Sequence, residues 1–246
     1  MRRLFFPFSG NSFFLDGDGF HHWVRVNRAQ VGDEIEVADG LGKVVVARLA
    51  KIEENRGLLE VVRSVPDTSN SPLQLTLAFG LLKGEKIDWV IQKAVEIGVD
   101  SLIPLEMEHS VLRWDEKKKI DRQKRWQKIA LEAAQQSGRE RVPEVLEVQK
   151  LSAAVKNFAE SGAIWVPHEN CRGDSLKRAL KAGMAKEKNM IIIGPEGGFS
   201  ANETEFLKNA GANLVTLGDA ILRAETAAIL ASGLMLYEWG LLGGQE

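Results

Sequence analysis

A glycine-rich loop in the C-terminal half of the chain has the residue types and spacing of a ligand site. Residues 191–193 are typical of a buried strand, and they lead into Gly194-Pro195-Glu196-Gly197-Gly198-Phe199-Ser200. Ser200 and Glu203 have the spacing of a capping box, which predicts the start of a helix. Ligands of open α/β sheets bind in such loops, beyond the carboxyl ends of the strands. The loop matches neither GxxxxGK[ST] nor GxGxxG, so it predicts close backbone contact with a ligand but no phosphate-binding lysine or dinucleotide fingerprint.

A second loop with a glycine follows in a similar context. Residues 214–217 indicate a short strand, Gly218 turns the chain, and an alanine-rich helix begins soon after. Arg223 and Glu225 stand between apolar Leu222 and that helix, where an unpaired charge is costly to bury. Two interpretations are open: a structural Arg223–Glu225 ion pair, or a functional arginine. For the first loop, the alternative to a ligand site is a plain tight turn.

A third element is strongly basic. Residues 117–137 have the apolar spacing of a long helix, which Gly138 ends as a C′ residue. The inward positions are Trp126, Ile129, Ala130, Ala133 and Ala134; the other face carries Lys117, Lys118, Arg122, Lys124, Arg125 and Lys128. Arg139 and Arg141 project beyond the helix, where compensation of the helix dipole is the alternative role. Residues 111–141 hold ten basic and five acidic side chains, a patch suited to a polyanion.

The elements around these motifs change character near residue 70. Before residue 70, the pattern predicts short strands with turns between them, at residues 22–26, 34–37, 43–52 and 58–65. Short strands at this spacing suggest a small barrel. Residues 66–72 are the best linker. After it, strands at 73–79, 101–105, 163–166, 190–193 and 214–217 alternate with helices, the first over residues 84–97. This alternation predicts a mostly parallel sheet covered on both faces, and hence an α/β domain over 73–246 behind a β-domain over 1–70.

Composition excludes several classes of protein. The 246 residues are 44% hydrophobic and 27% charged with a net charge of -2, typical of a globular protein rather than a disordered one. The single cysteine, Cys171, rules out an internal disulfide framework, and the four histidines show no metal-binding spacing. The apolar run 226–237 is too short to span a bilayer. The first residues imitate a signal peptide only briefly before Pro7 interrupts them, so we expect a cytoplasmic protein.

Several of these runs, taken together, resemble the RsmE family of 16S ribosomal RNA methyltransferases, in the SPOUT superfamily. The resemblance rests on the two glycine loops, on Ser137-Gly138-Arg139 with Arg141-Val142-Pro143, on Lys83-Gly84-Glu85-Lys86, and on His22 to Arg28. It implies an N-terminal PUA-like barrel and a C-terminal domain threaded into a trefoil knot. It also implies S-adenosylmethionine as cofactor, a homodimer, and methylation of N3 of one uridine in the decoding region of the small subunit. A non-enzymatic RNA-binding assembly factor is the alternative.

The resemblance and the loops together give the expected site residues. For the cofactor they are Pro167, His168, Gly194, Pro195, Glu196, Gly197, Gly198, Leu217, Gly218, Leu222, Arg223 and Thr226. Methylation of uridine N3 releases a proton and leaves an anion on the base, which Arg139 or Arg223 can stabilise. No general base is evident. His109, which stands where the family usually has an arginine, is a candidate, although a lone histidine is more often structural.

Two surfaces are expected to meet partners. RNA contacts are predicted for Arg2, Arg3, Arg25, Arg28, Arg113, Lys124, Arg125 and Lys128, with a solvated basic face as the alternative. Residues 227–242 are apolar on every side except near Glu238, so both sides of this helix need cover. We expect Ile229 or Leu230 to pack on the sheet, and Ala231, Ser232 and Gly233 to approach a second copy. Leu234 or Leu236 is then the outward position of a homodimer interface.

Overall fold

The computed structural model describes residues 3–66, 71–169, 171 and 174–244. The predicted RNA contact Arg2 and most of the predicted linker lie outside these residues. The chain divides into two compact units. The first comprises Met1–Asn70 and Leu131–Val142, and the second comprises Ser71–Ala130 and Pro143–Glu246. The grouping of residues 131–142 with the N-terminal unit was not anticipated from the sequence.

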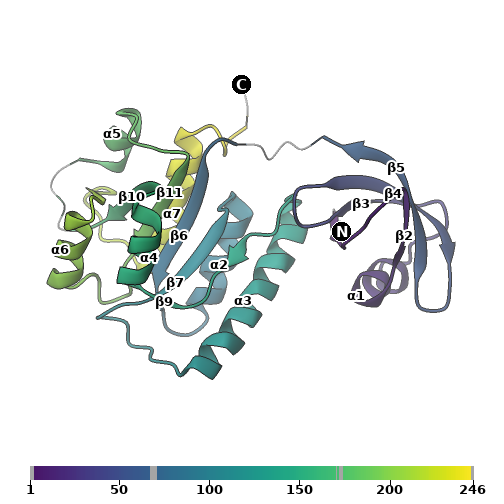
Figure 1. Ribbon diagram of the computed structural model, residues 1–246, viewed down its shortest axis with the longest axis horizontal. Helices are drawn as coiled ribbons and strands as arrows, with labels where there is room; N and C mark the ends of the chain where they lie inside the picture. Colours follow the sequence, from purple (N-terminus) through teal and green to yellow (C-terminus); the bar gives the residue numbers. More distant parts are fainter. Residues whose placement is uncertain (1–2, 67–70, 170, 172–173, 245–246) are drawn as a thin grey trace. The chain divides into compact units, whose positions relative to one another are not determined.

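The first unit is built on a curled five-stranded sheet (Figure 1). The strand order is β1-β3-β4-β5-β2, with only β1 and β3 parallel. The strands are β1 (Arg3–Phe5), β2 (Ser12–Leu15), β3 (Glu34–Ala38), β4 (Val44–Ile52) and β5 (Gly57–Val65). The last three confirm the predicted strands, and β1 and β2 were not anticipated. Inward residues that include Leu15, Val37, Leu49 and Leu59 form the core.

The prediction of a strand over residues 22–26 was wrong. The short helix α1 (Gly17–Phe20) continues into a π-helical turn, η1 (His21–Val26). Phe20, Trp23 and Val24 are buried in the core of the sheet. Their spacing of three and four residues belongs to a helix, whereas a half-buried strand buries every second residue. The weak alternation was therefore misleading.

The second unit contains the predicted parallel sheet. Its path is β12-β10-β11-β6-β7-β8, with β9 also pairing with β7, and all of its ladders are parallel. The strands are β6 (Gln74–Gly80), β7 (Ser101–Glu106), β8 (Glu144–Val145), β9 (Gln149–Lys150), β10 (Gly162–Pro167), β11 (Lys188–Ile193) and β12 (Asn213–Val215).

Helices cover both faces of this sheet (Figure 1). α2 (Lys86–Ile97) packs against α7 (Ala224–Glu238), which also contacts β6, β11 and α5 (Leu176–Lys181). On the other face, α4 (Leu151–Ala159) and α6 (Ala201–Asn209) cover Met190 and Ile192. Ile191 and Ile193 alternate with these residues and point the opposite way, so both faces of β11 are buried. The predicted basic helix is α3 (Glu116–Ser137).

The inward side of α7 differs from the expectation. Ala228, Ala231, Ser232, Met235 and Leu236 are its buried residues. Ile229 or Leu230 was expected to pack on the sheet; Ile229 is only partly buried and Leu230 is exposed, so neither belongs to the buried core of α7. Ala231 and Ser232 pack within the unit because small side chains let α7 approach its neighbours closely, and they are not available to a second copy. The exposed side instead presents an apolar stripe of Leu230, Leu234 and Tyr237, followed by Leu241.

Candidate cofactor site

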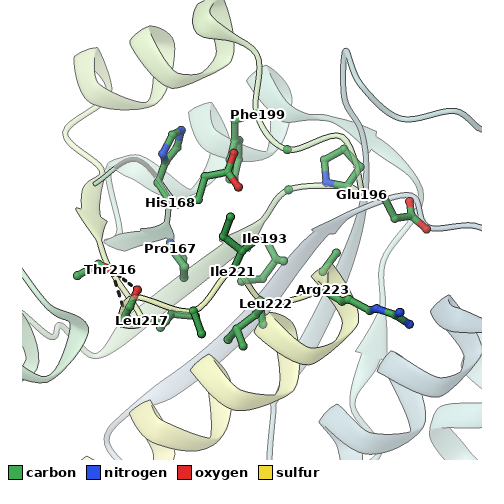
Figure 2. Close-up of a pocket in the computed structure, with 18 of the residues that line it drawn as sticks. Pro167, His168, Ile193, Glu196, Phe199, Thr216, Leu217, Ile221, Leu222 and Arg223 are labelled. Carbon is green, nitrogen blue, oxygen red and sulfur yellow. Dashed lines mark hydrogen bonds between the residues drawn. The ribbon is translucent and has the colours of Figure 1, made fainter. Parts of the chain in front are cut away.

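A cavity of about 420 Å³ lies in the second unit, beyond the carboxyl ends of β10, β11 and β12 (Figure 2). This volume is in the range of small-molecule sites, and the position is the one at which open α/β sheets bind ligands. The lining residues come from three strand-to-helix segments and from the start of α2. They are Lys86, Pro167, His168, Glu169, Ile193, Gly194, Pro195, Glu196, Gly198, Phe199, Thr216, Leu217, Gly218, Ala220, Ile221, Leu222, Arg223, Ala224 and Ala227.

The cavity brings together most of the predicted cofactor residues. Gly197 and Thr226 are the two that do not line it. Lys86, Glu169, Ile193, Phe199, Thr216 and Ile221 are among the lining residues that were not predicted from the sequence. Figure 2 shows Glu196 and Arg223 on one side of the cavity, and Pro167, His168 and Thr216 on the opposite side. Thr216 shapes the second loop, because its Oγ1 accepts a hydrogen bond from the Gly218 N–H over 3.1 Å.

Gly197 is needed for a close contact with His109, in the loop after β7. A Cβ at this position would lie 2.9 Å from Cβ of His109, closer than side chains tolerate. The Nδ1 of His109 lies 3.0 Å from the Gly197 carbonyl oxygen. Since that oxygen can only accept, Nδ1 carries the hydrogen. His109 therefore fastens the loop after β7 onto the glycine loop, which supports the structural interpretation of this histidine.

Two further side chains, Glu203 and Arg113, hold the loop after β7 in place. Glu203 is buried and forms the predicted capping box with Ser200. Its Oε2 accepts from the Ser200 N–H over 2.9 Å, and its Oε1 accepts from the Glu108 N–H over 2.8 Å. The guanidinium of Arg113 donates to the carbonyls of Met107, Glu108, Ser110 and Leu112. These bonds give Arg113 a structural role, and its predicted contact with an RNA phosphate stays a prediction.

A network of charges joins α2 to both cavity loops. The ammonium of Lys86 lies 3.1 Å from Glu196 Oε1 and 3.4 Å from Glu225 Oε2. The hydrogen bond to Glu196 raises the pKa of Lys86. Partial burial opposes ionisation of Glu196, but hydrogen bonds from the Lys83 N–H and from Lys86 outweigh it and lower the pKa of Glu196. The Arg223–Glu225 pair considered from the sequence is replaced by this Lys86–Glu225 pair. Arg223 is exposed and lines the cavity.

His168 is the histidine of the cavity. Its ring stacks on Phe199 with centroids 5.8 Å apart, and its Nε2 lies 3.3 Å from Thr204 Oγ1. The Thr204 hydroxyl donates to the Ser200 carbonyl, so it accepts from the Nε2–H of His168. Burial lowers the pKa of His168, because the charged ring loses hydration. The histidine is therefore neutral at pH 7.

The remaining predicted residues lie outside the cavity. Arg139 belongs to the first unit. Arg3 is only 7% exposed and pairs with Glu36 over 2.8 Å, so its predicted contact with RNA does not fit its burial. Arg25 is exposed and donates to the Glu54 carbonyl, and Arg28 adopts a positive φ of 59°. Lys124, Arg125 and Lys128 are exposed on α3, where Arg125 also pairs with Asp88 over 2.6 Å.

Neither a metal-binding cluster nor a membrane-spanning helix is found in the part of the chain that the structure describes. Within residues 3–66, 71–169, 171 and 174–244, no group of three or more His, Cys, Asp or Glu side chains is placed to hold a metal ion. Over the same residues, no helix has both the length and the apolar character needed to cross a membrane.

Comparison with known protein families defines the class of this chain. Residues 69–236 match the RNA methyltransferase domain, and residues 15–62 match the RNA methyltransferase PUA domain. The chain is therefore an RNA methyltransferase by family, with the cavity inside the matched methyltransferase segment.

Individual relatives make the family assignment more specific. Ribosomal RNA small subunit methyltransferase E of Bacillus subtilis is 32% identical, with 96% of this chain and 93% of the relative covered. The enzyme of the same name from Mycobacterium tuberculosis is 31% identical, with 92% and 87% covered. The chain belongs to the ribosomal RNA small subunit methyltransferase E family, as the motifs predicted.

Solved structures agree with this assignment. The Neisseria gonorrhoeae ribosomal RNA small subunit methyltransferase E, crystallised bound to S-adenosyl methionine, is 30% identical with a TM-score of 0.85, covering 97% of this chain and 98% of that one. A Legionella pneumophila methyltransferase in complex with the same cofactor is 26% identical with a TM-score of 0.83, covering 96% and 97%.

Proposed function

We propose that this protein methylates N3 of one uridine in the decoding region of 16S ribosomal RNA, with S-adenosylmethionine as the methyl donor. The observation that carries the proposal is the cavity at the ends of β10, β11 and β12, lined by both glycine loops in a chain of this family. A non-enzymatic assembly factor would have no need of such a cavity. The choice of uridine N3 rests on the family resemblance.

The lining of the cavity fits the chemistry of this cofactor. S-adenosylmethionine combines an apolar ring and chain with an amino acid end that carries both charges. Ile193, Leu217 and Leu222 provide apolar walls, while Glu169 and Arg223 provide charges of both signs. Around Gly218, with a φ of +120°, no atom lies within 4 Å of the position a Cβ would take, so a ligand can approach the backbone there. When bound, S-adenosylmethionine supplies an electrophilic methyl group.

The residues of the chain position the reactants and stabilise charge. N3 loses its proton to solvent and forms a bond to the methyl carbon, while the methyl–sulfur bond of the donor breaks and its sulfonium becomes a neutral thioether. Deprotonation of N3 spreads negative charge onto the two neighbouring carbonyl oxygens of the base. The guanidinium of Arg223, at the cavity edge, stabilises this charge in the proposed mechanism. Arg139 is the second candidate for this role, contributed by the partner subunit of a dimer. Most of the remaining effect is positioning.

The proposal extends to partners. Arg25, Arg28, Lys124, Arg125 and Lys128 contact RNA phosphates, which gives affinity without sequence information. A homodimer forms through the exposed stripe of α7, and the substrate is the assembled small subunit in the cytoplasm. The trefoil knot implied by the family resemblance stays a prediction.

Calorimetry of the full chain with S-adenosylmethionine tests the cofactor. We expect saturable binding that Gly218→Val abolishes, because a β-branched residue cannot adopt this φ. Gly211→Val is the matched control: Gly211 also has a positive φ (+77°) and open space around it, but lies outside the cavity. Absence of heat with the folded wild-type protein would contradict the proposal. Mass mapping of 16S RNA from deletion-strain small subunits, after their incubation with the protein, locates the methylated nucleotide. Chromatography of that nucleoside against methyluridine standards identifies the atom, and any atom other than uridine N3 overturns the assignment.

A further inference from the structure

We infer that Lys86 is a positioning residue for methyl transfer: by binding Glu196 and Glu225 at once, it holds the two loops of the cofactor cavity at their working separation. The inference rests on the proposed use of S-adenosylmethionine. Neither the sequence motifs nor the family assignment gives Lys86 this role.

The three residues come from three separate segments. Lys86 is the first residue of α2, Glu196 lies in the glycine loop after β11, and Glu225 lies in the first turn of α7. The second loop leads directly into α7, so Glu225 fixes its far end. The side chains are only 35%, 28% and 16% exposed, respectively. One ammonium therefore connects both loops of the cavity to a rigid helix.

Water cannot take the place of Lys86 as the partner of Glu225. Within the described part of the chain, Oε2 of Glu225 is a fully buried atom that accepts no hydrogen bond, although Lys86 Nζ lies 3.4 Å away. Glu196 has a second hydrogen-bond donor, because its Oε1 also accepts from the Lys83 N–H over 3.1 Å. The charge of Glu225 is thus compensated by Lys86, and burial makes an uncompensated carboxylate costly.

Removal of the ammonium leaves two carboxylates that both stood within 3.4 Å of it. Two carboxylates that share one ammonium are close enough to repel each other once it is removed, and the repulsion acts directly on the spacing between the glycine loop and the start of α7. Without the ammonium, burial and the neighbouring like charge both favour the protonated form of one carboxyl group, and its protonation relieves the repulsion. A variant without the ammonium therefore binds the cofactor more weakly at high pH than at low pH, a dependence that a simple packing defect does not produce.

Other ionisable groups face the same region, so their effect on the pH dependence of binding must be separated from that of Lys86. His168, Glu169 and Arg223 line the cavity with Lys86 and Glu196, and Lys83 and Glu85 flank Lys86 at the start of α2. All of them are present in the wild-type protein and in the variants. The pH dependence of the variants, relative to the wild type at each pH, therefore isolates the Lys86 network.

The experiment measures the dissociation constant of S-adenosylmethionine by calorimetry for the full chain at about pH 8 and about pH 5.5. Lys86→Met is expected to weaken binding about tenfold at the higher pH, a usual size for coupling between neighbouring residues, and less at the lower pH. Lys86→Met combined with Glu225→Gln removes the repulsion but not the loss of the bridge, so it should recover only part of the affinity and should lose the extra dependence on pH. Lys86→Arg keeps the charge and retains binding.

Lys93→Met is the matched control. Lys93 is on the same helix, has the same 35% side-chain exposure and pairs with Glu96 over 2.9 Å, away from the cavity. This variant should bind as the wild type does. Wild-type affinity in Lys86→Met overturns the inference, as does an equal weakening at both pH values without rescue by Glu225→Gln. Failure of the wild-type chain to bind contradicts the proposed function instead. If Lys86→Met does not fold by circular dichroism, the double variant decides the question. Weaker binding in the double variant with retained binding in Lys86→Arg supports the inference, and wild-type affinity in the double variant overturns it.

Discussion

The backbone N–H of Glu108 donates a hydrogen bond of 2.8 Å to Oε1 of Glu203, across 95 positions of sequence. The other oxygen of the same carboxylate caps α6 through Ser200. A single buried side chain thus begins a helix and anchors the loop that follows β7. Because a hydrogen bond to a charged, buried carboxylate is stronger than one between neutral groups, this loop depends on Glu203 for its conformation.

Glu203→Ala should therefore lower the free energy of unfolding by about 1–3 kcal/mol, since two backbone donors are left without their acceptor. Hydrogen exchange should accelerate at the amides of Glu108 and Ser200 before it does so in β6. Chemical unfolding and exchange mass spectrometry measure these effects. Glu205→Ala, on the exposed face of α6, is the control and should change neither. Unchanged protection of the Glu108 amide in Glu203→Ala would show that the loop is held elsewhere.

Leu234→Arg should convert a dimer into monomers. Leu234 is 42% exposed in the apolar stripe of α7, whereas Leu236 is 1% exposed and belongs to the core. A charge at Leu234 prevents apolar packing against a second copy without disturbing the fold, and methyl transfer should fall with the dimer. Sedimentation velocity at micromolar concentration measures the state. Val62→Arg, at a comparably exposed valine (44%) in the first unit, should remain dimeric. A wild-type protein that sediments as a monomer with full activity contradicts the proposed interface.

Lys124→Glu with Lys128→Glu should weaken RNA binding and leave the affinity for S-adenosylmethionine unchanged. Arg125 is kept, because its pair with Asp88 connects α3 to α2. The slope of log affinity against log salt should fall by about 0.7–0.9 for each RNA phosphate that the variant no longer neutralises. Lys177→Glu with Lys181→Glu has the same four-residue spacing on the exposed side of α5 and is the control. An unchanged slope in the α3 variant would show that this face is only solvated.

His168→Gln should flatten the dependence of stability on pH. Burial lowers the pKa of His168 from its usual 6.5, so the folded state favours the neutral ring. The resulting stability is fully present above pH 6.5 and is lost as the pH falls through the lowered pKa. Glu196 also has a lowered pKa, but its contribution changes only below its usual 4.5. Urea unfolding at about pH 7.5 and about pH 5.5 therefore isolates the histidine. An equal decrease of stability in the wild type and the variant would contradict the assignment.

Local patterns were sufficient for much of the fold. The isoleucines of β11 and the capping box of Ser200 and Glu203 depend on neighbours within a few residues, so their positions could be predicted. Residues 22–26 were misread because their alternation was too short to separate a strand from a helical turn. Lys86 was missed as a cavity residue, because its partners Glu196 and Glu225 are more than a hundred positions away. The contact of Gly197 with His109, 88 positions away in the sequence, could not be predicted from a local pattern.

The order of strands in the second sheet affects how the protein is made. β6 is the first strand of that sheet to leave the ribosome, yet it lies between β7 and β11. Its pairing with β7 needs only the next segment of chain, whereas its other edge pairs Gln74 with Lys188. Open strand edges are templates for association with other chains, and pairing between distant segments is slow. A nascent chain that has emerged as far as α5 therefore carries an unpaired edge on β6. It is most exposed to aggregation, and most dependent on chaperones, until β11 as far as Ile193 has left the ribosome.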